Sequence, residues 1–130
     1  MARVLLIEPD AVLARVCRTA LMNAGHDVVQ EGDAQSAVNA CDEQTPDIIV
    51  MEIQLTNHSG AELLYEIRSY SEWQNIPVVV FTVVPPSEFN DSWSQISADL
   101  KLGAYLYKQD TSLAKLKSTV EKQLADSESK

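Results

Sequence analysis

Short apolar runs alternate with amphipathic segments along the whole chain. Apolar runs at 3–7, 48–51, 78–82 and 104–107, and a short, more polar run at 27–30, have the length of strands, and 78–82 is the richest in β-branched residues. Between them, apolar residues recur every three or four positions at 13–24, 34–43, 60–70, 87–102 and 112–124. The pattern therefore predicts five strands that alternate with five helices.

Individual residues mark the ends of the predicted helices. Gly25 and Gly103 follow the first and fourth helices, as glycines often do just past a helix end. Asp33 and Thr111 are predicted to cap the starts of the second and fifth helices, and Ser59 lies near the start of the third.

The spacing of apolar residues predicts which helix faces point inward. In the first helix these are Leu13, Val16, Cys17, Ala20, Leu21 and Ala24. In the fourth they are Phe89, Trp93, Ile96 and Leu100, and in the fifth Leu113, Leu116, Val120 and Leu124.

Strands that alternate with helices favour a parallel sheet covered on both faces. The continuous apolar run 48–51 is typical of a central strand, whereas the polar run 27–30 suits an edge. Right-handed crossovers leave few topologies. We predict an α/β fold, a flavodoxin-like (βα)5 three-layer sandwich with a parallel sheet of order 2-1-3-4-5.

Composition narrows the class of protein. The 130 residues suit one domain, predicted at 1–125 with a polar tail at 126–130, and carry a net charge of −9 that disfavours direct nucleic-acid binding. No apolar run approaches a membrane span, and the first residues do not resemble a signal peptide, so we expect a cytoplasmic protein. Cys17 and Cys41 are expected to be buried, reduced thiols.

Chemically active side chains follow four of the predicted strands. Glu8 and Asp10 follow the first strand, Glu52 the third, Thr82 ends the fourth, and Lys108 follows the fifth. Because the carboxyl ends of parallel strands meet at one edge of a sheet, these side chains are predicted to share a pocket.

These residues, in this order, resemble a known family. The segment 46–53, followed by Ser59 and Gly60, is similar to the third strand, active-site acid and loop of the receiver domains of two-component response regulators. Thr82 and Lys108 match that family's hydroxyl and lysine positions. Tyr105 lies where family members often carry an aromatic rotamer switch, although a half-buried strand aromatic explains it equally well.

The resemblance implies a phosphoryl switch. In the family, an aspartate accepts a phosphoryl group from a histidine kinase beside a divalent ion held by neighbouring acids, and lysine and hydroxyl groups bind the new oxygens. Developing charge in such a reaction is stabilised by a positioned cation and a metal. The face formed by the fourth helix, fifth strand and fifth helix then changes its partners.

The chain departs from the family pattern at the reactive positions. Glu52 replaces the aspartate acceptor, and its extra methylene moves the carboxylate by about 1.5 Å, enough to spoil in-line attack. Pro9 replaces the acid that most directly binds the metal. Asp10 compensates only if its side chain turns inward rather than capping the first helix. We therefore expect no required cofactor and at best weak Mg²⁺ binding by Glu8, Asp10 and Glu52.

Residues around the pocket differ as well. Thr56 replaces a loop proline, Val83 a small residue and Gln109 the proline after the lysine. The loop histidine His58 is expected to be exposed rather than reactive.

Glu52 admits two interpretations. A carboxylate that reaches Lys108 and Thr82 would imitate an activated receiver without a kinase, with one charge instead of nearly two. Alternatively, Glu52 and Lys108 form a plain ion pair without signalling consequence.

We predict a non-enzymatic, receiver-like signalling module that is independent of phosphorylation and acts through protein contacts. Its predicted contact face is the fourth helix, fifth strand and fifth helix, with a homodimer as one option. Phosphorylation by a histidine kinase, direct nucleic-acid binding and membrane binding are not expected. The alternatives are a conventional phosphoryl- or metal-responsive receiver with another acceptor, and a small-ligand or nucleotide-binding flavodoxin-like domain, although acids after the first strand repel phosphate.

Overall fold

The computed structural model of the chain describes residues 2–55, 59–89 and 92–128. Its strands are β1 (Arg3–Ile7), β2 (Asp27–Glu31), β3 (Ile48–Met51), β4 (Val78–Thr82) and β5 (Ala104–Tyr107). Its helices are α1 (Ala11–Asn23), α2 (Ala34–Glu43), α3 (Gly60–Ser69), α4 (Ser92–Asp99) and α5 (Leu113–Glu128). Three short 3-10 turns join them, η1 (Ser71–Trp73), η2 (Pro86–Phe89) and η3 (Lys108–Asp110).

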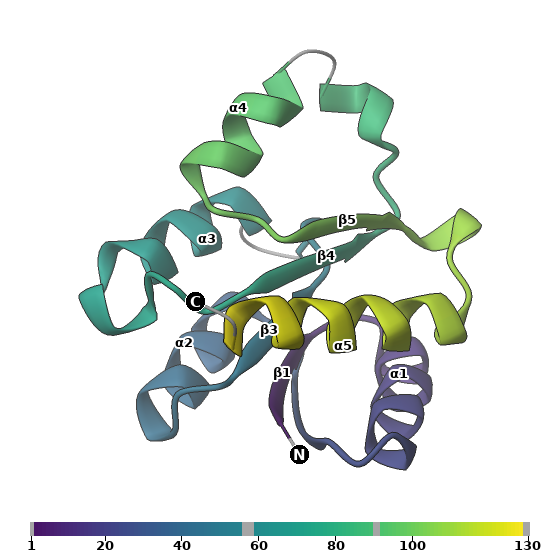
Figure 1. Cartoon of the computed structure of the whole chain (residues 1–130). Coiled ribbons are helices and arrows are strands. Elements are labelled where there is room, and N and C mark those ends of the chain that lie inside the picture. The colour runs from purple at the N-terminus through teal and green to yellow at the C-terminus, as the bar shows by residue number, and fades with distance from the viewer. Residues whose placement is uncertain (1, 56–58, 90–91, 129–130) are drawn as a thin grey trace.

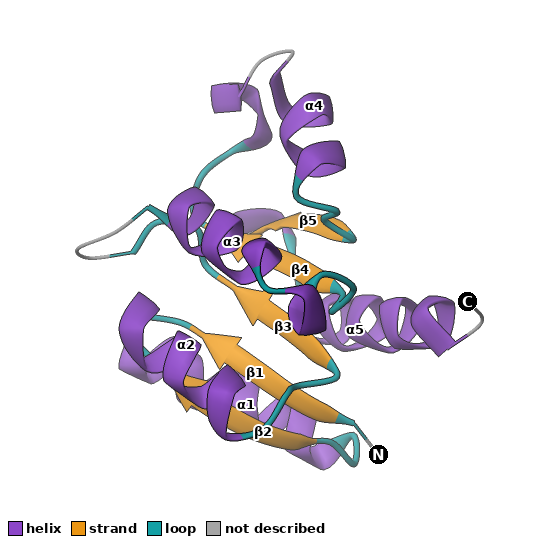
Figure 2. Ribbon diagram, turned by 90° about the vertical axis from the view of Figure 1, so that its left-hand side faces the viewer, coloured by secondary structure: helices purple, strands orange, loops and turns teal. Residues whose placement is uncertain are grey.

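The five strands form one parallel sheet in the order β2-β1-β3-β4-β5. Figure 2 shows this order from β2 at the bottom to β5 at the top. All residues of β3 are buried, whereas β2 is only partly covered at the edge. The predicted α/β fold and strand order are confirmed, and the sheet places all five strand carboxyl ends along one edge.

Two apolar clusters fill the space on the two faces of the sheet. One cluster joins alternate strand residues to α2, α3 and Trp73, and the other joins the remaining strand residues to α1 and α5. Figure 1 shows the resulting three layers. Strand residues alternate between the clusters because successive side chains of a strand point to opposite faces.

Most predicted caps are confirmed, and one is wrong. Asp33 accepts the N–H of Ser36 at the start of α2, and Ser59 accepts the N–H of Glu62 in α3. Gly25 follows α1 with φ of 96°, a backbone conformation in which glycine is favoured. The fifth helix instead uses Ser112.

At the start of α5, the Ser112 Oγ accepts the N–H of Lys115 at 3.0 Å. The Thr111 hydroxyl, which was the predicted cap, donates backwards to the Tyr107 carbonyl at 2.7 Å. Ser112 therefore caps α5 in place of Thr111, whose hydroxyl is directed back toward the end of β5.

Two residues of the predicted inward faces point toward solvent. Val16 is 42% exposed because the buried stripe of α1 runs through Ala14, Cys17 and Leu21. Leu113, the first residue of α5, is 39% exposed, whereas Leu116 and Val120 of the same stripe are buried. Both cysteines are buried and free, as predicted.

The last two helices differ in length from their predictions. The segment predicted as one helix at 87–102 contains the short turn η2 and the eight-residue α4, in which Leu100 is buried just past the end. The side chains of Phe89 and Trp93 lie outside the described residues. Helix α5 continues through Glu128, beyond the last apolar position of its stripe.

Gly60 joins the β3 loop to α3 at a point too tight for a side chain. Its N–H donates to the Ile53 carbonyl at 2.7 Å, and a Cβ would lie only 2.7 Å from the same oxygen. We expect Gly60→Ala to lower the free energy of unfolding by about 2–3 kcal/mol through overpacking. Gly32→Ala is the matched control, because its Cβ would meet nothing closer than 3.9 Å. Urea denaturation of both variants tests this, and equal stabilities would contradict it.

Candidate functional site at the carboxyl ends of the strands

The structure brings the predicted side chains together at the carboxyl edge of the sheet. Glu8 follows β1, Glu52 follows β3, Thr82 ends β4 and Lys108 follows β5. Glu8, Glu52 and Thr82 are 4%, 3% and 0% exposed, which makes them the buried polar side chains among the described residues. A polar cluster of this kind stays buried only if its members satisfy one another.

Lys108 binds both carboxylates at once. Its Nζ lies 2.7 Å from Glu8 Oε1 and 2.8 Å from Glu52 Oε1, and its side chain is only 11% exposed. The same Nζ lies 5.6 Å from the centre of the Phe81 ring, which adds a cation–π contact. Two carboxylates therefore share one ammonium group, and the cluster carries a net charge of −1.

Four donors surround the Glu52 carboxylate. Lys108 Nζ and the Val83 N–H bind Oε1, the latter at 3.0 Å. The Thr82 hydroxyl and the Gln54 N–H, at 3.0 Å, bind Oε2. The two backbone donors were not foreseen, because an N–H group has no signature in the side-chain sequence.

Burial and the shared lysine act in opposite directions on the pKa values of the two acids, and the balance differs between them. Burial raises the pKa of Glu8 above its ordinary value of 4.5, and its bonds to Lys108 and the Asp10 N–H offset this only in part. Burial also acts to raise the pKa of Glu52, but the four donors outweigh it and the pKa is lowered. Burial acts to lower the pKa of Lys108, and hydrogen bonds and charge attraction from both carboxylates raise it instead.

Asp10 turns away from the cluster. Its Oδ1 accepts the N–H groups of Val12 and Leu13 at 3.0 and 3.1 Å, so the side chain caps α1. Only the backbone of Asp10 reaches the site, where its N–H donates to Glu8 Oε2 at 3.2 Å. Of the two orientations considered from the sequence, the structure has the capping one.

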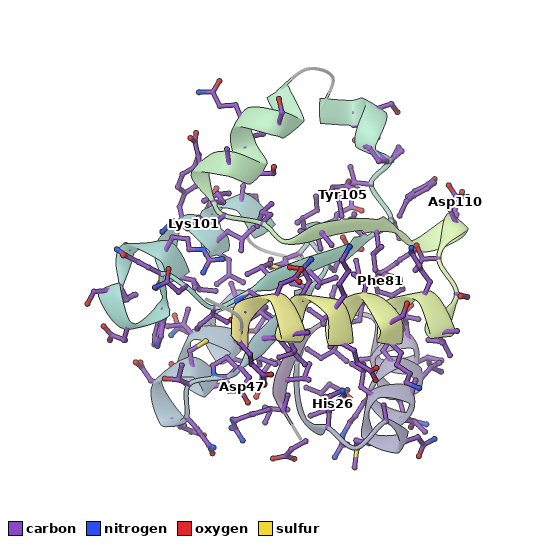
Figure 3. The ribbon with its side chains drawn as sticks, viewed as in Figure 1. His26, Asp47, Phe81, Lys101, Tyr105 and Asp110 are labelled. Atoms are coloured by element: carbon purple, nitrogen blue, oxygen red, sulfur yellow. The ribbon has the colours of Figure 1, made fainter. Side chains whose placement is uncertain are left out.

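A hydrogen-bonded connection runs from Glu52 to Tyr105 through the loop after β4. The Thr82 Oγ1 accepts the Val84 N–H at 3.1 Å while it donates to Glu52. The Val84 carbonyl accepts the hydroxyl of Tyr105, which packs against the α2–α3 cluster on the opposite face of the sheet from Phe81 (Figure 3). Burial, followed by the charges of Glu52 and Glu88, raises the pKa of Tyr105 to about 12. Both the N–H and the carbonyl of Val84 are therefore hydrogen-bonded.

The remaining sequence candidates do not join the cluster. Val83 is 47% exposed, so its side chain lies at the rim although its N–H binds Glu52. Thr56 and His58 lie outside the described residues. Within the described ranges, no three His, Cys, Asp or Glu side chains are grouped so that they could hold a metal ion, and no helix is long and apolar enough to cross a membrane.

The fold and the site define a class of signalling module. The model of the response regulator receiver domain family matches residues 4–109, and the chain belongs to that family. Receiver domains of two-component systems are signalling modules that work through contacts with other proteins.

Curated relatives agree with this assignment. A probable transcriptional regulatory protein of Mycobacterium tuberculosis, TcrX, is 34% identical over 79 residues, covering 61% of this chain and 33% of its own length. The transcriptional regulatory protein KdpE of the same organism is 29% identical over 98% of this chain and 55% of its own length. This chain thus spans about a third to a little over half of these relatives.

Solved structures show the same fold. A CheY-like response regulator receiver domain protein from Methanospirillum hungatei superposes with a TM-score of 0.87 at 18% identity, over 99% of this chain and 98% of its own. At that identity the likeness establishes the fold alone.

Proposed function

We propose that this receiver domain signals without phosphorylation of Glu52 and without a bound divalent cation, through contacts with other proteins. The observation that carries the proposal is the occupation of the phosphoryl-binding groups. The Lys108 ammonium and the Thr82 hydroxyl, which match positions that bind phosphoryl oxygens in the family, both bind the Glu52 carboxylate. The cluster is therefore satisfied in the absence of a phosphoryl group.

The donor set supports the absence of a divalent cation. Mg²⁺ requires near-octahedral oxygen ligands. Pro9 offers no side-chain oxygen, and the Asp10 carboxylate is used by the first turn of α1. The Glu8 and Glu52 carboxylates already share the Lys108 ammonium group. These residues do not fit a divalent metal ion.

The connection through Val84 supports a role in signalling rather than a plain ion pair. Glu52 holds Thr82, Thr82 holds the Val84 N–H, and Tyr105 holds the Val84 carbonyl. A chain of hydrogen bonds that starts at Glu52 thus fixes the loop between β4 and α4. We place the partner on the face formed by α4, β5 and α5, with a second copy of this chain as one candidate partner.

The named relatives suggest a role for a longer protein that contains such a domain. They are called transcriptional regulators, and their chains are longer than this one. Gene regulation would belong to such a whole protein. The net charge of −9 argues that this domain does not itself bind nucleic acid.

Intact-mass spectrometry with acetyl phosphate and Mg²⁺ tests the proposal. We expect the native chain to gain no phosphoryl group. The double variant Pro9→Asp, Glu52→Asp restores both the acceptor and the missing acid, and we expect it to gain one phosphoryl group that maps to position 52. Glu52→Asp alone should gain less, because the metal ligand is still absent.

A matched control is Glu66→Asp, the same change at an exposed position on α3. It should behave like the native chain. A phosphoryl group on the native chain would overturn the proposal, and its mapped position would identify the acceptor that a conventional receiver uses instead.

A further inference from the structure

A cavity lies at the opposite edge of the sheet from the Glu52 cluster. It has a volume of about 560 Å³, within the usual range for small-molecule sites. The turns before β4 and β5 and the last turns of α5 line this open pocket, which places it at the amino ends of those strands. Its walls combine the apolar residues Ile76, Pro77 and Leu102 with amide and charged groups.

The cavity carries a positive charge surplus in a strongly acidic chain. The charged residues that line it are Arg68, Lys101 and Asp126, two cations and one acid. By contrast, the cavity of about 450 Å³ at Ala2 and His26 is lined by three acids. In a chain with a net charge of −9, a local cationic surplus selects for an anion.

Arg68 brings an uncompensated charge to this cavity. Its Nε, Nη1 and Nη2 donate to the carbonyls of Leu100, Trp73 and Lys101 at 2.8, 2.8 and 3.2 Å. Those acceptors are neutral, and no carboxylate pairs with Arg68 among the described residues. Three of the five guanidinium N–H groups are used, so two remain to bind a planar or tetrahedral oxyanion.

Lys101 occupies a position where glycine would be more favourable. Its φ is 54°, in the left-handed region, and it ends α4 with two closing bonds. These run from the Lys101 N–H to the Ala98 carbonyl and from the Leu102 N–H to the Ser97 carbonyl. This helix ending commonly contains glycine at the Lys101 position. A lysine there keeps a cation beside Arg68 at a conformational cost.

Amide groups complete the lining. Gln74, Asn75 and Gln123 contribute carboxamides, and Gln123 Nε2 donates to the Gly103 carbonyl at 3.2 Å. Carboxamides donate and accept hydrogen bonds, so they suit a ligand that carries polar groups in addition to its charge.

We propose that this cavity binds a small organic anion, with its carboxylate or phosphate at Arg68 and Lys101 and its apolar part against Ile76 and Leu102. This inference is independent of the state of Glu52. A ligand there would contact the α4–β5 turn, where Figure 3 labels Lys101, and the end of α5. It would thereby reach two elements of the proposed partner face.

Nuclear magnetic resonance titration of the isotope-labelled chain tests this binding at constant ionic strength. The probes are sodium benzoate for a carboxylate and sodium phenyl phosphate for a phosphate, with benzyl alcohol as the neutral analogue. We expect saturable shift changes at Asn75, Gly103 and Gln123 with at least one anion and none with the alcohol. The anion that binds more tightly shows whether the cavity prefers a carboxylate or a phosphate.

Three variants separate binding from structure. Lys101→Gly should raise the thermal midpoint, because it relieves the left-handed backbone, and should weaken probe binding about fivefold or more. Asp126→Asn should tighten binding, because it removes the one acid in the lining. Lys117→Gln, an exposed lysine on α5 outside the lining, should bind like the native chain.

The inference is overturned by shifts that grow linearly without saturation, by shifts elsewhere in the chain, or by unchanged affinity in Lys101→Gly. Any of these would leave Arg68 as a structural cap of α4 alone. Phosphorylation of the native chain would overturn the proposal about Glu52 and would not affect this one.

Discussion

Lys108→Met is expected to destabilise the protein by about 3–5 kcal/mol at pH 7, because it leaves two buried carboxylates without a cation. Glu8 and Glu52 are almost fully buried, and Lys108 Nζ lies within 2.8 Å of both. Methionine has a similar length and keeps the contact with the Phe81 ring region, so the loss reports on charge rather than on volume. Urea denaturation monitored by circular dichroism measures it.

The pH dependence makes this expectation more specific. Without the ammonium group, burial raises the pKa of both acids, so each takes up a proton in the folded state as the pH falls from neutral. The cost of Lys108→Met should therefore shrink between pH 7 and pH 5. Lys117→Met, at an exposed lysine on α5, is the control and should change stability little. A cost under about 1 kcal/mol at pH 7 would show that solvent, not Lys108, neutralises the acids.

The strand pattern is the part of the fold that the sequence predicts best. Polar residues or turn residues follow each apolar run, and the ends of these runs match the bounds of β1, β3, β4 and β5. Burial on both faces demands apolar residues at consecutive positions, which produces a local signal. The topology follows because β2 is polar enough to lie at the edge.

Helix orientation is less predictable because it depends on tertiary contacts. Apolar spacing around α1 allows both Val16 and Ala14 on the inner stripe, and the packing against the sheet buries Ala14. The cap of α5 also depends on contacts beyond the local sequence, because Thr111 and Ser112 are both residue types that cap helices. In the structure the Thr111 hydroxyl donates to the Tyr107 carbonyl, and Ser112 caps the helix.

The members of the candidate site could be predicted from the sequence, whereas their bonding could not. Parallel strand ends must meet, so Glu8, Glu52, Thr82 and Lys108 were expected together. That one ammonium group binds two acids depends on side-chain geometry. The Val83 N–H is a main-chain donor, and almost every residue type would supply the same group, so the sequence does not reveal it.

Removal of the charge should cost much more stability at Glu52 than at Glu8, although both acids share Lys108. Glu52→Gln places an amide NH₂ among four donors, so two of them lose their acceptor. We expect a loss of about 2–3 kcal/mol at pH 7. Glu8→Gln keeps an amide oxygen for Lys108 but loses the charge of that ion pair and the 3.2 Å bond from the Asp10 N–H. It also relieves the burial of a charge, and because Lys108 keeps Glu52 as a partner we expect the net change to stay within about 1 kcal/mol.

The signs of the pKa shifts predict how these differences vary with pH. The pKa of Glu52 is lowered, so its charge contributes stability above pH 4.5, and this contribution disappears as the pH falls through the folded-state value. The pKa of Glu8 is raised, so its contribution is present below pH 4.5 and disappears as the pH rises through the folded-state value.

Unfolding free energies of the native chain, Glu8→Gln and Glu52→Gln across pH 3–8 measure both trends. As the pH falls from 8, the native chain should gain stability relative to Glu8→Gln before it loses stability relative to Glu52→Gln. Parallel curves for the two variants would mean that the acids share the lysine equally. In that case Glu8 and Glu52 would be interchangeable partners of Lys108. Glu52 would then not be the acid that fixes Thr82 and the loop that leads to Tyr105.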